Sequence, residues 1–197
     1  LFSFLFVFSF SFTQVDAQNV IYVDASATSD GDGTSWANAY DSLQPALAGT
    51  NVGDTLWVAG GTYKPTNTTN RDTSFVIPNS VSVYGGFEGT ESQLSQRDWR
   101  NNETILSGDI GTEGDTTDNS YHVVSFNNAS NQTVLDGFTI TLANNDDVGN
   151  GGGIYLVASG SGNNCEPLIR NSKISNNYAD DGGGIFILGN GGTASPE

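Results

Sequence analysis

Two charged side chains at matching places in successive sequence units are the first candidates for chemistry. Asp136 lies in the phrase VLDG, and Arg170 falls near the equivalent place of the next unit, in LIRN. Asp109 adds a carboxylate from an earlier apolar segment, TILSGDI. Carboxylates and a basic group that meet on one surface can move protons at a reacting bond. The competing interpretation, which the sequence favours, is a solvated ion pair that contributes little.

Two pairs of aspartates suggest a calcium site. Asp146 and Asp147 precede one glycine triplet, and Asp180 and Asp181 precede the next. If the units stack, these pairs could lie on adjacent turns, and converging carboxylate oxygens suit Ca²⁺. The sequence DGDG at 30–33 resembles half of an EF-hand loop but lacks its closing Glu. Aspartate is also a common turn residue, and we favour that interpretation for each group.

Other residue types add little chemistry. His122 is the only histidine and Cys165 the only cysteine, so neither a zinc site nor an internal disulfide is expected. The glycine-rich phrases lack the Lys-Ser/Thr of a phosphate loop. Aromatic rings are the other candidates, because a ring can stack on a sugar while its rim tolerates polar groups. These are Trp36, Tyr40, Trp57, Tyr63, Tyr84, Phe87, Trp99 and Tyr155.

The elements that would position these residues follow from a repeat. GGGIYL at 151–156 returns as GGGIFI at 182–187, and each copy follows a similar apolar phrase. The alignment pairs Leu135 with Ile169, Ile140 with Ile174, Asn145 with Asn177, and Ile154 with Ile185. Units of this size that recur in step are typical of a solenoid, in which each unit buries its apolar face against its neighbours. Like residues then stack, so isoleucines fill the core and asparagines form a hydrogen-bonded ladder.

Short β-branched segments separated by Gly, Asn, Asp and Ser predict strands. They lie at 19–26, 74–77, 81–87, 104–110, 122–126, 133–140, 153–158, 167–174 and 184–188, and the segment 53–63 is a strand followed by a glycine turn. The best helix candidate is 39–49, where Tyr40, Leu43 and Leu47 share a face. We therefore expect an all-β fold, a right-handed parallel β-helix solenoid with a short N-terminal capping helix. The cap would occupy about 19–63 of a single domain over 18–197.

Several stretches resemble known families of this fold. IYVDASATSDGDGTSWANAYDSLQPAL, followed by GDTLWVAGGTY, resembles the entry segment of right-handed parallel β-helix proteins, and VLDGFTI resembles the pectate-lyase-type coil repeat. YGGFEGTESQLSQRDWRNNETILSGDI is similar to a segment of large secreted bacterial surface proteins. ISNN and GGGIF resemble the repeats of chlamydial polymorphic outer-membrane proteins. The resemblance implies three parallel sheets and a secreted or surface location. It also implies a C-terminal sorting or anchoring domain, so the sequence given is expected to be an N-terminal piece.

Charge and the N-terminal segment limit location and partners. The apolar run at 1–12, followed by Val15-Asp16-Ala17, predicts a clipped signal peptide over 1–17. No later segment is long and apolar enough to span a bilayer. The formal net charge of −16 disfavours nucleic acid as a partner. The remaining partners are extracellular polysaccharides or surface proteins.

Three functions remain open. Repetition without a convergent catalytic set favours a secreted or bacterial cell-surface protein that is adhesin-like or binds glycans without catalysis. The resemblance also permits a polysaccharide lyase or glycosidase built on Asp136, Arg170 and Asp109, with Ca²⁺ as its only suggested cofactor, although no complete lyase or galacturonase motif is present. The third function is a structural spacer.

Overall fold

Residues 18–28 and 31–197, which the computed structural model describes, form mostly β-structure with one α-helix. The expected signal peptide at 1–17 and Asp30 lie outside these residues. All pairings between the strands are parallel. The prediction of an all-β chain is therefore confirmed for the described part. No helix in that part is long and apolar enough to cross a membrane.

Three larger sheets contain most of the strands. Sheet A consists of β1 (Val20–Val23), β2 (Thr55–Ala59), β5 (Ser82–Phe87), β8 (Val134–Asp136) and β13 (Leu168–Arg170). Sheet B consists of β3 (Gly61–Tyr63), β6 (Thr104–Ser107), β9 (Phe138–Thr141) and β14 (Lys173–Ser175). Sheet C consists of β4 (Phe75–Val76), β7 (Val124–Asn127), β11 (Ile154–Ser159) and β16 (Ile185–Asn190). Two smaller sheets pair β10 (Asn144–Asn150) with β15 (Tyr178–Asp181), and β12 (Asn164–Cys165) with β17 (Thr193–Ala194).

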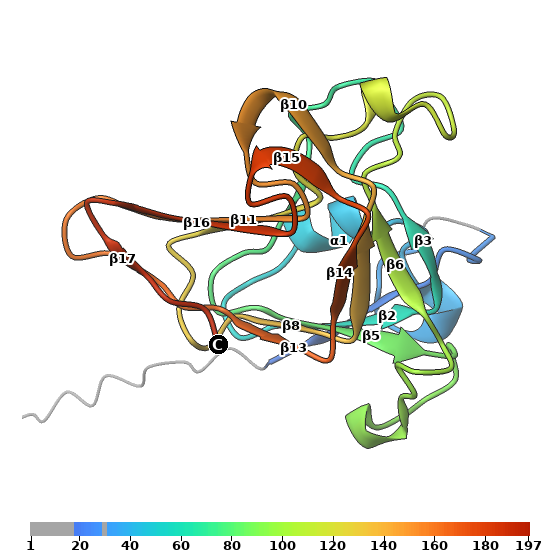
Figure 1. The fold of residues 1–197 in the computed structure, drawn as a ribbon. Helices are drawn as coiled ribbons and strands as arrows, with labels where there is room; N and C mark the ends of the chain where they lie inside the picture. The colour runs from blue at the N-terminus through green and yellow to red at the C-terminus, as the bar shows by residue number, and fades with distance from the viewer. Residues whose placement is uncertain (1–17, 29–30) are drawn as a thin grey trace, which may run out of the picture.

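The chain visits the three larger sheets in turn. After β2, β3 and β4 it returns to sheet A with β5, and each return adds the next strand to the growing edge (Figure 1). The last two passes also insert a strand of each smaller sheet. This order is consistent with a parallel β-helix, because every sheet collects strands that are one full pass apart in the sequence.

Register confirms three of the four pairings that the repeat predicts. Leu135 lies opposite Ile169, Ile140 opposite Ile174, and Ile154 opposite Ile185. The fourth is wrong, because Asn145 lies opposite Ala179.

The two asparagines of the wrong pairing bind backbone groups instead of forming a ladder: Asn177 binds the preceding pass of the chain, and Asn145 binds its own segment. Asn177 accepts from the N–H of Ala143 at 2.9 Å and donates to the carbonyl of Ile140 at 3.0 Å. The buried Asn145 donates to the carbonyls of Asn150 and Gly151. Buried backbone groups that a bend in the chain leaves unpaired need partners, and these side chains supply them.

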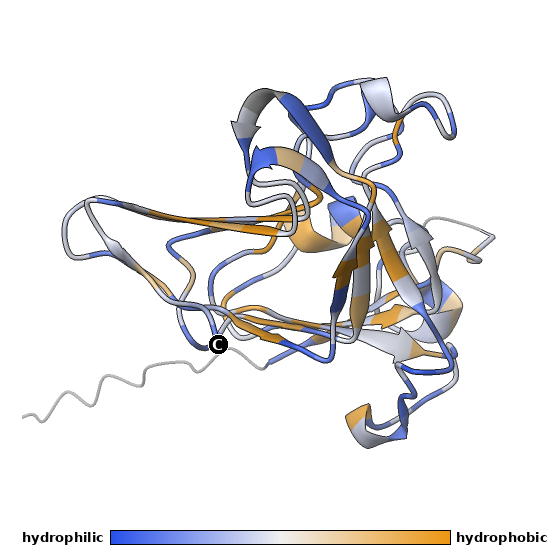
Figure 2. Ribbon diagram, in the orientation of Figure 1, coloured by the Kyte–Doolittle hydropathy of each residue, from blue (hydrophilic) through white to orange (hydrophobic). Residues whose placement is uncertain are grey.

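The core lies between the sheets and is filled by alternate residues of the strands. Leu135, Ile140, Ile154 and Leu156 are fully buried within one continuous apolar cluster. Figure 2 shows apolar residues along the strands that surround this interior. Alternation follows from strand geometry, because successive side chains point to opposite faces.

The α-helix of the described residues, α1 (Leu43–Ala48), packs against β1, β2 and β4, the early strands of sheets A and C. Leu43, Ala46 and Leu47 are buried. The helix begins later than the predicted 39–49, because Tyr40 instead forms a parallel bridge with Val23. Pro45 lies in the first turn of α1, where backbone N–H groups form no hydrogen bond within the helix, so the lack of an N–H in proline costs nothing there.

Corners divide two of the predicted strands. The segment 133–140 breaks at Gly137 (φ 90°), and 167–174 breaks at Asn171 (φ 49°). Glycine and asparagine tolerate this left-handed conformation better than other residues. Three short 3₁₀ helices, η1 (Trp36–Asn38), η2 (Leu94–Gln96) and η3 (Thr116–Asp118), lie in loops.

Candidate functional site

Asp136 and Arg170 are neighbours in the structure, as the repeat suggests. They lie directly opposite each other where β8 and β13 end. The carboxylate of Asp136 does not face solvent, because its side chain is only 8 % exposed, whereas Arg170 is exposed. Asp109 lies beyond the far end of β6, where it accepts from the N–H of Gly114 and pairs with Lys64 at 3.9 Å. The structure thus brings together Asp136 and Arg170 but places Asp109 at the other end of sheet B.

The partner of Asp136 is Arg97, which the sequence did not single out. The guanidinium Nη2 of Arg97 lies 2.8 Å from Oδ1 of Asp136, and the Arg97 side chain is 11 % exposed. Its Nη1 donates to the carbonyls of Gly85 at 2.9 Å and Asp136 at 3.1 Å. The side chain of Asn171 donates to the same carboxylate oxygen at 2.8 Å. Asp136 is therefore held as an acceptor between two passes of the chain, and Arg97 fastens the loop at 88–103 to this corner.

Two glycines allow that loop to approach. Gly86 has φ 93°, and a Cβ there would meet the Cα of Trp99 at 2.3 Å. Gly137 has φ 90°, and a Cβ there would meet Nη1 of Arg97 at 2.8 Å. Only a residue without a side chain fits both the conformation and the space. These glycines explain why the loop packs tightly on the corner between sheets A and B.

The docked loop and the outer face of sheet B enclose an open hollow of about 350 Å³, here called the corner hollow. The loop contributes Trp99, Arg100 and Glu103, and the next passes of the chain contribute Asn171 and Lys173. Its remaining lining residues are Thr104, Gly137, Phe138 and Thr139.

Several polar groups around the corner hollow are oriented by contacts with their neighbours. The guanidinium of Arg100 lies 3.9 Å from the centre of the Trp99 ring, a cation–π contact. The hydroxyl of Thr139 donates to Oε1 of Glu103 at 2.7 Å. Lys173 is exposed and lies opposite Thr139 in the register of β14 and β9. The hollow therefore combines an aromatic ring with polar groups, of which Arg100, Glu103 and Thr139 are held by their neighbours.

The corner also gathers positive charge on an acidic protein. Four of the six Lys and Arg residues of the chain lie in or beside it, whereas the formal net charge is −16. These four, here called the corner patch, are Arg97, Arg100, Arg170 and Lys173. Of these four residues the sequence pointed only to Arg170, because Arg97 and Arg100 are distant in the chain and reach the corner through the loop.

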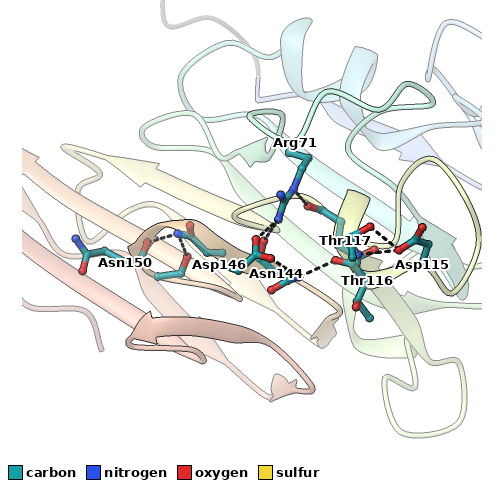
Figure 3. Close-up of polar contacts among 10 residues, drawn as sticks. Arg71, Asp115, Thr116, Thr117, Asn144, Asp146 and Asn150 are labelled. Carbon is teal, nitrogen blue, oxygen red and sulfur yellow. Dashed lines mark hydrogen bonds and ion pairs between the residues drawn. The ribbon is translucent and has the colours of Figure 1, made fainter.

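A second polar cluster involves the candidate calcium residues and serves as a clamp between loops (Figure 3). Arg71 pairs with Asp146 at 2.6 Å and donates to the carbonyls of Asn119 and Asn144 at 2.8 and 2.6 Å. Asn144 in turn donates to the carbonyl of Thr116 at 2.7 Å. The hydrogen bond from Arg71 lowers the pKa of Asp146 below its ordinary value. These contacts join the three successive chain segments that connect a strand of sheet B to the next strand of sheet C.

The other calcium candidates do not converge in the described part of the chain. Asp181 lies opposite Asn150, and Asp180 and Asp181 are both exposed on β15. The side-chain placement of Asp147 lies outside the description. Within residues 18–28 and 31–197, no group of three or more His, Cys, Asp or Glu residues is placed to hold a metal ion.

His122 and most of the aromatic candidates have structural surroundings. Nδ1 of His122 lies 2.5 Å from the carbonyl of Gly151, and its ring stacks on Tyr155, with 4.6 Å between centroids. Burial lowers the pKa of this imidazole. Trp36, Trp57 and Phe87 pack on one another beside sheet A. Among the aromatic candidates, Trp99 is the one that lines the corner hollow.

Comparison of the chain with protein-family models, with curated proteins and with solved structures finds no match.

Proposed function

We propose that this chain is a right-handed parallel β-helix of a secreted or cell-surface protein and that it binds glycans, without catalysis, in the corner hollow. The strand order, one strand per sheet on each pass, supports the fold. The apolar run at 1–12 and the small residues after it support export. The absence of a convergent catalytic set in the sequence supports binding over chemistry.

One observation carries the binding proposal: Trp99, hydrogen-bonding groups and cations line one pre-formed hollow. A sugar ring presents apolar C–H groups on its faces and hydroxyls on its rim, so an aromatic ring and oriented polar groups complement it. Arg100 and Lys173, which come from different passes of the chain, favour a sugar that carries a carboxylate or sulfate. The ion pair of Arg97 with Asp136 keeps the loop, and hence Trp99, in place.

The test is a glycan array probed with purified protein, followed by titration of each hit. We expect Trp99→Ala to weaken binding at least tenfold, or about 1.4 kcal/mol. Tyr178→Ala is the matched control, because Tyr178 is an exposed aromatic residue on β15, away from the hollow. Lys173→Gln should weaken binding of acidic glycans more than that of neutral ones.

The same material separates the alternatives. Release of unsaturated or reducing products from a panel of polysaccharides would identify a lyase or glycosidase instead. Binding that survives Trp99→Ala would place the ligand elsewhere. No binding across a broad panel would refute the proposal and leave the role of a structural spacer.

A further inference from the structure

Arg100 lies over the aromatic ring that lines the corner hollow. Its guanidinium carbon is 3.9 Å from the centre of the Trp99 ring, and the residue is exposed to solvent. At this distance the π-electrons of the indole attract the planar cation. A sugar that stacks on this face of the ring must therefore displace the guanidinium or bind together with it.

The backbone that carries these two side chains is held on both sides. A Cβ added at Gly86 would lie 2.3 Å from the Cα and 2.6 Å from the Cβ of Trp99, so the base of the indole packs directly on Gly86. The N–H groups of Arg100 and Asn101 donate to Oδ1 of Asp98 at 3.2 and 3.3 Å. The indole is thus anchored at its base, and the long side chain of Arg100 is the part that a ligand can move.

The donors of the Arg100 guanidinium are available to a ligand. Within the described part of the chain, the side chain of Arg100 forms no ion pair and donates no hydrogen bond, whereas the guanidinium of Arg97 binds Asp136 and Gly85. A guanidinium presents its N–H groups as a planar fork that matches the two oxygens of a carboxylate. The carboxylate of a hexuronate complements this fork, but the hydroxymethyl group of a neutral hexose forms no ion pair with it.

The two cations that line the corner hollow differ in what they do to a neutral sugar. The protein as a whole has a formal net charge of −16, so attraction of an acidic sugar must come from cations in direct contact with it. Arg100 and Lys173 both line the hollow, but only Arg100 lies over the Trp99 ring. Lys173 therefore adds attraction for an acidic sugar, whereas Arg100 also competes with a neutral one.

We propose that Arg100 makes the corner hollow selective for hexuronates over neutral sugars, an inference that rests on the glycan binding proposed above. A neutral sugar must move the guanidinium off Trp99 before it stacks there, and it gains no ion pair in return. Loss of a cation–π contact at an exposed site corresponds to binding that is about two- to fivefold weaker. A hexuronate instead uses the same guanidinium as its partner, so one side chain both attracts the correct ligand and opposes the wrong one.

Pairs of oligosaccharides that differ only in charge test this proposal. The probes are the hexuronate oligosaccharides of the glycan array, each compared with the same oligosaccharide after reduction of its carboxylates to hydroxymethyl groups. Calorimetric titration of Arg100→Gln should show binding of the hexuronate about threefold weaker or more. It should also show binding of the reduced counterpart about twofold tighter or more, because the ring face is then free.

Lys173→Gln is the matched control, since it removes the other cation of the hollow without uncovering the ring. It should weaken binding of the hexuronate and leave binding of the reduced counterpart unchanged. In a Trp99→Ala background, Arg100→Gln should no longer improve binding of the reduced counterpart. Circular dichroism of each variant checks that the fold is retained.

The outcomes distinguish this proposal from the function on which it rests. If neither the wild type nor any variant binds a glycan, both fail. If the wild type binds glycans through Trp99 but does not distinguish the members of a pair, or prefers sulfated glycans to hexuronates, only the selectivity is overturned. If Arg100→Gln weakens binding of both members equally, Arg100 merely supports the loop, and the proposal is again overturned while glycan binding stands.

Discussion

Removal of the Arg97 guanidinium is the most informative perturbation of the corner. Arg97→Met preserves much of the side-chain volume but leaves the carboxylate of Asp136 with only the Asn171 hydrogen bond among its side-chain contacts. Both charged side chains are nearly buried, at 11 % and 8 % exposure. Removing one partner of a buried pair costs about 3–5 kcal/mol, because the other charge stays out of water without compensation. The carbonyls of Gly85 and Asp136 also lose their donor.

The expected result is a loss of about 3–5 kcal/mol in the free energy of unfolding, measured by urea denaturation. Arg100→Met is the matched control: Arg100 is exposed, and loss of its contact with Trp99 should cost less than about 1 kcal/mol. The double variant Arg97→Met/Asp136→Leu removes both charges and should recover part of the loss, since apolar replacements of buried pairs are often tolerated. A single variant that loses less than about 1 kcal/mol, or a double variant no more stable than Arg97→Met, would refute the assignment of this pair as the anchor of the loop.

Three further outcomes are expected. Burial lowers the pKa of His122, so as the pH falls the unfolded chain binds a proton before the folded chain does, and the folded state should lose stability below about pH 6.5. His122→Gln should remove this pH dependence between about pH 7.5 and 5.5, which thermal unfolding at each pH would measure. Gly86→Ala should lower the free energy of unfolding by about 1–3 kcal/mol, because the positive φ of Gly86 and its contact with the Trp99 backbone both oppose a side chain. The same change should displace the loop and make the fluorescence of Trp99 easier to quench with an added solute. An unchanged free energy of unfolding would contradict this expectation. Ile154→Ala should lower the free energy of unfolding by about 2–5 kcal/mol, measured by chemical denaturation, because the fully buried Ile154 lies between two neighbouring strands of sheet C. A loss below about 1 kcal/mol would mean that the side chains around it are not closely packed.

The repeat predicts the vertical pairings well because like residues in successive units meet in the same layer. Leu135, Ile140 and Ile154 find the partners that the alignment gives them. The prediction fails at Asn145, where the chain between sheets B and C bends and its backbone groups need partners. The sequence favours turns at the aspartate pairs 146–147 and 180–181, yet these residues lie in β10 and β15, which pair with each other. Asn and Asp are depleted in strands, and their local pattern therefore concealed this small sheet.

The sequence identified only some of the residues that form the corner hollow and its surroundings. Asp136 and Arg170 were selected because the repeat aligns them, and they are neighbours in space. Arg97, Trp99 and Arg100 belong to a loop without counterpart in the other passes, so no repeat marks them. Trp99 was one of eight aromatic candidates, and nothing in the sequence distinguished it from the others.

Period-two alternation, corner glycines and recurring isoleucines determine from the sequence alone that this chain forms short strands and stacks them. Each of these signals is local or repeats at a fixed spacing, so no long-range information is needed to detect it. The tertiary structure alone decides that the loop at 88–103 folds back on Gly86 and Gly137, that Arg97 takes Asp136 as its partner, and that four cations share one corner. These outcomes depend on contacts between residues distant in the chain, and such contacts form only after the sheets have fixed where each corner lies.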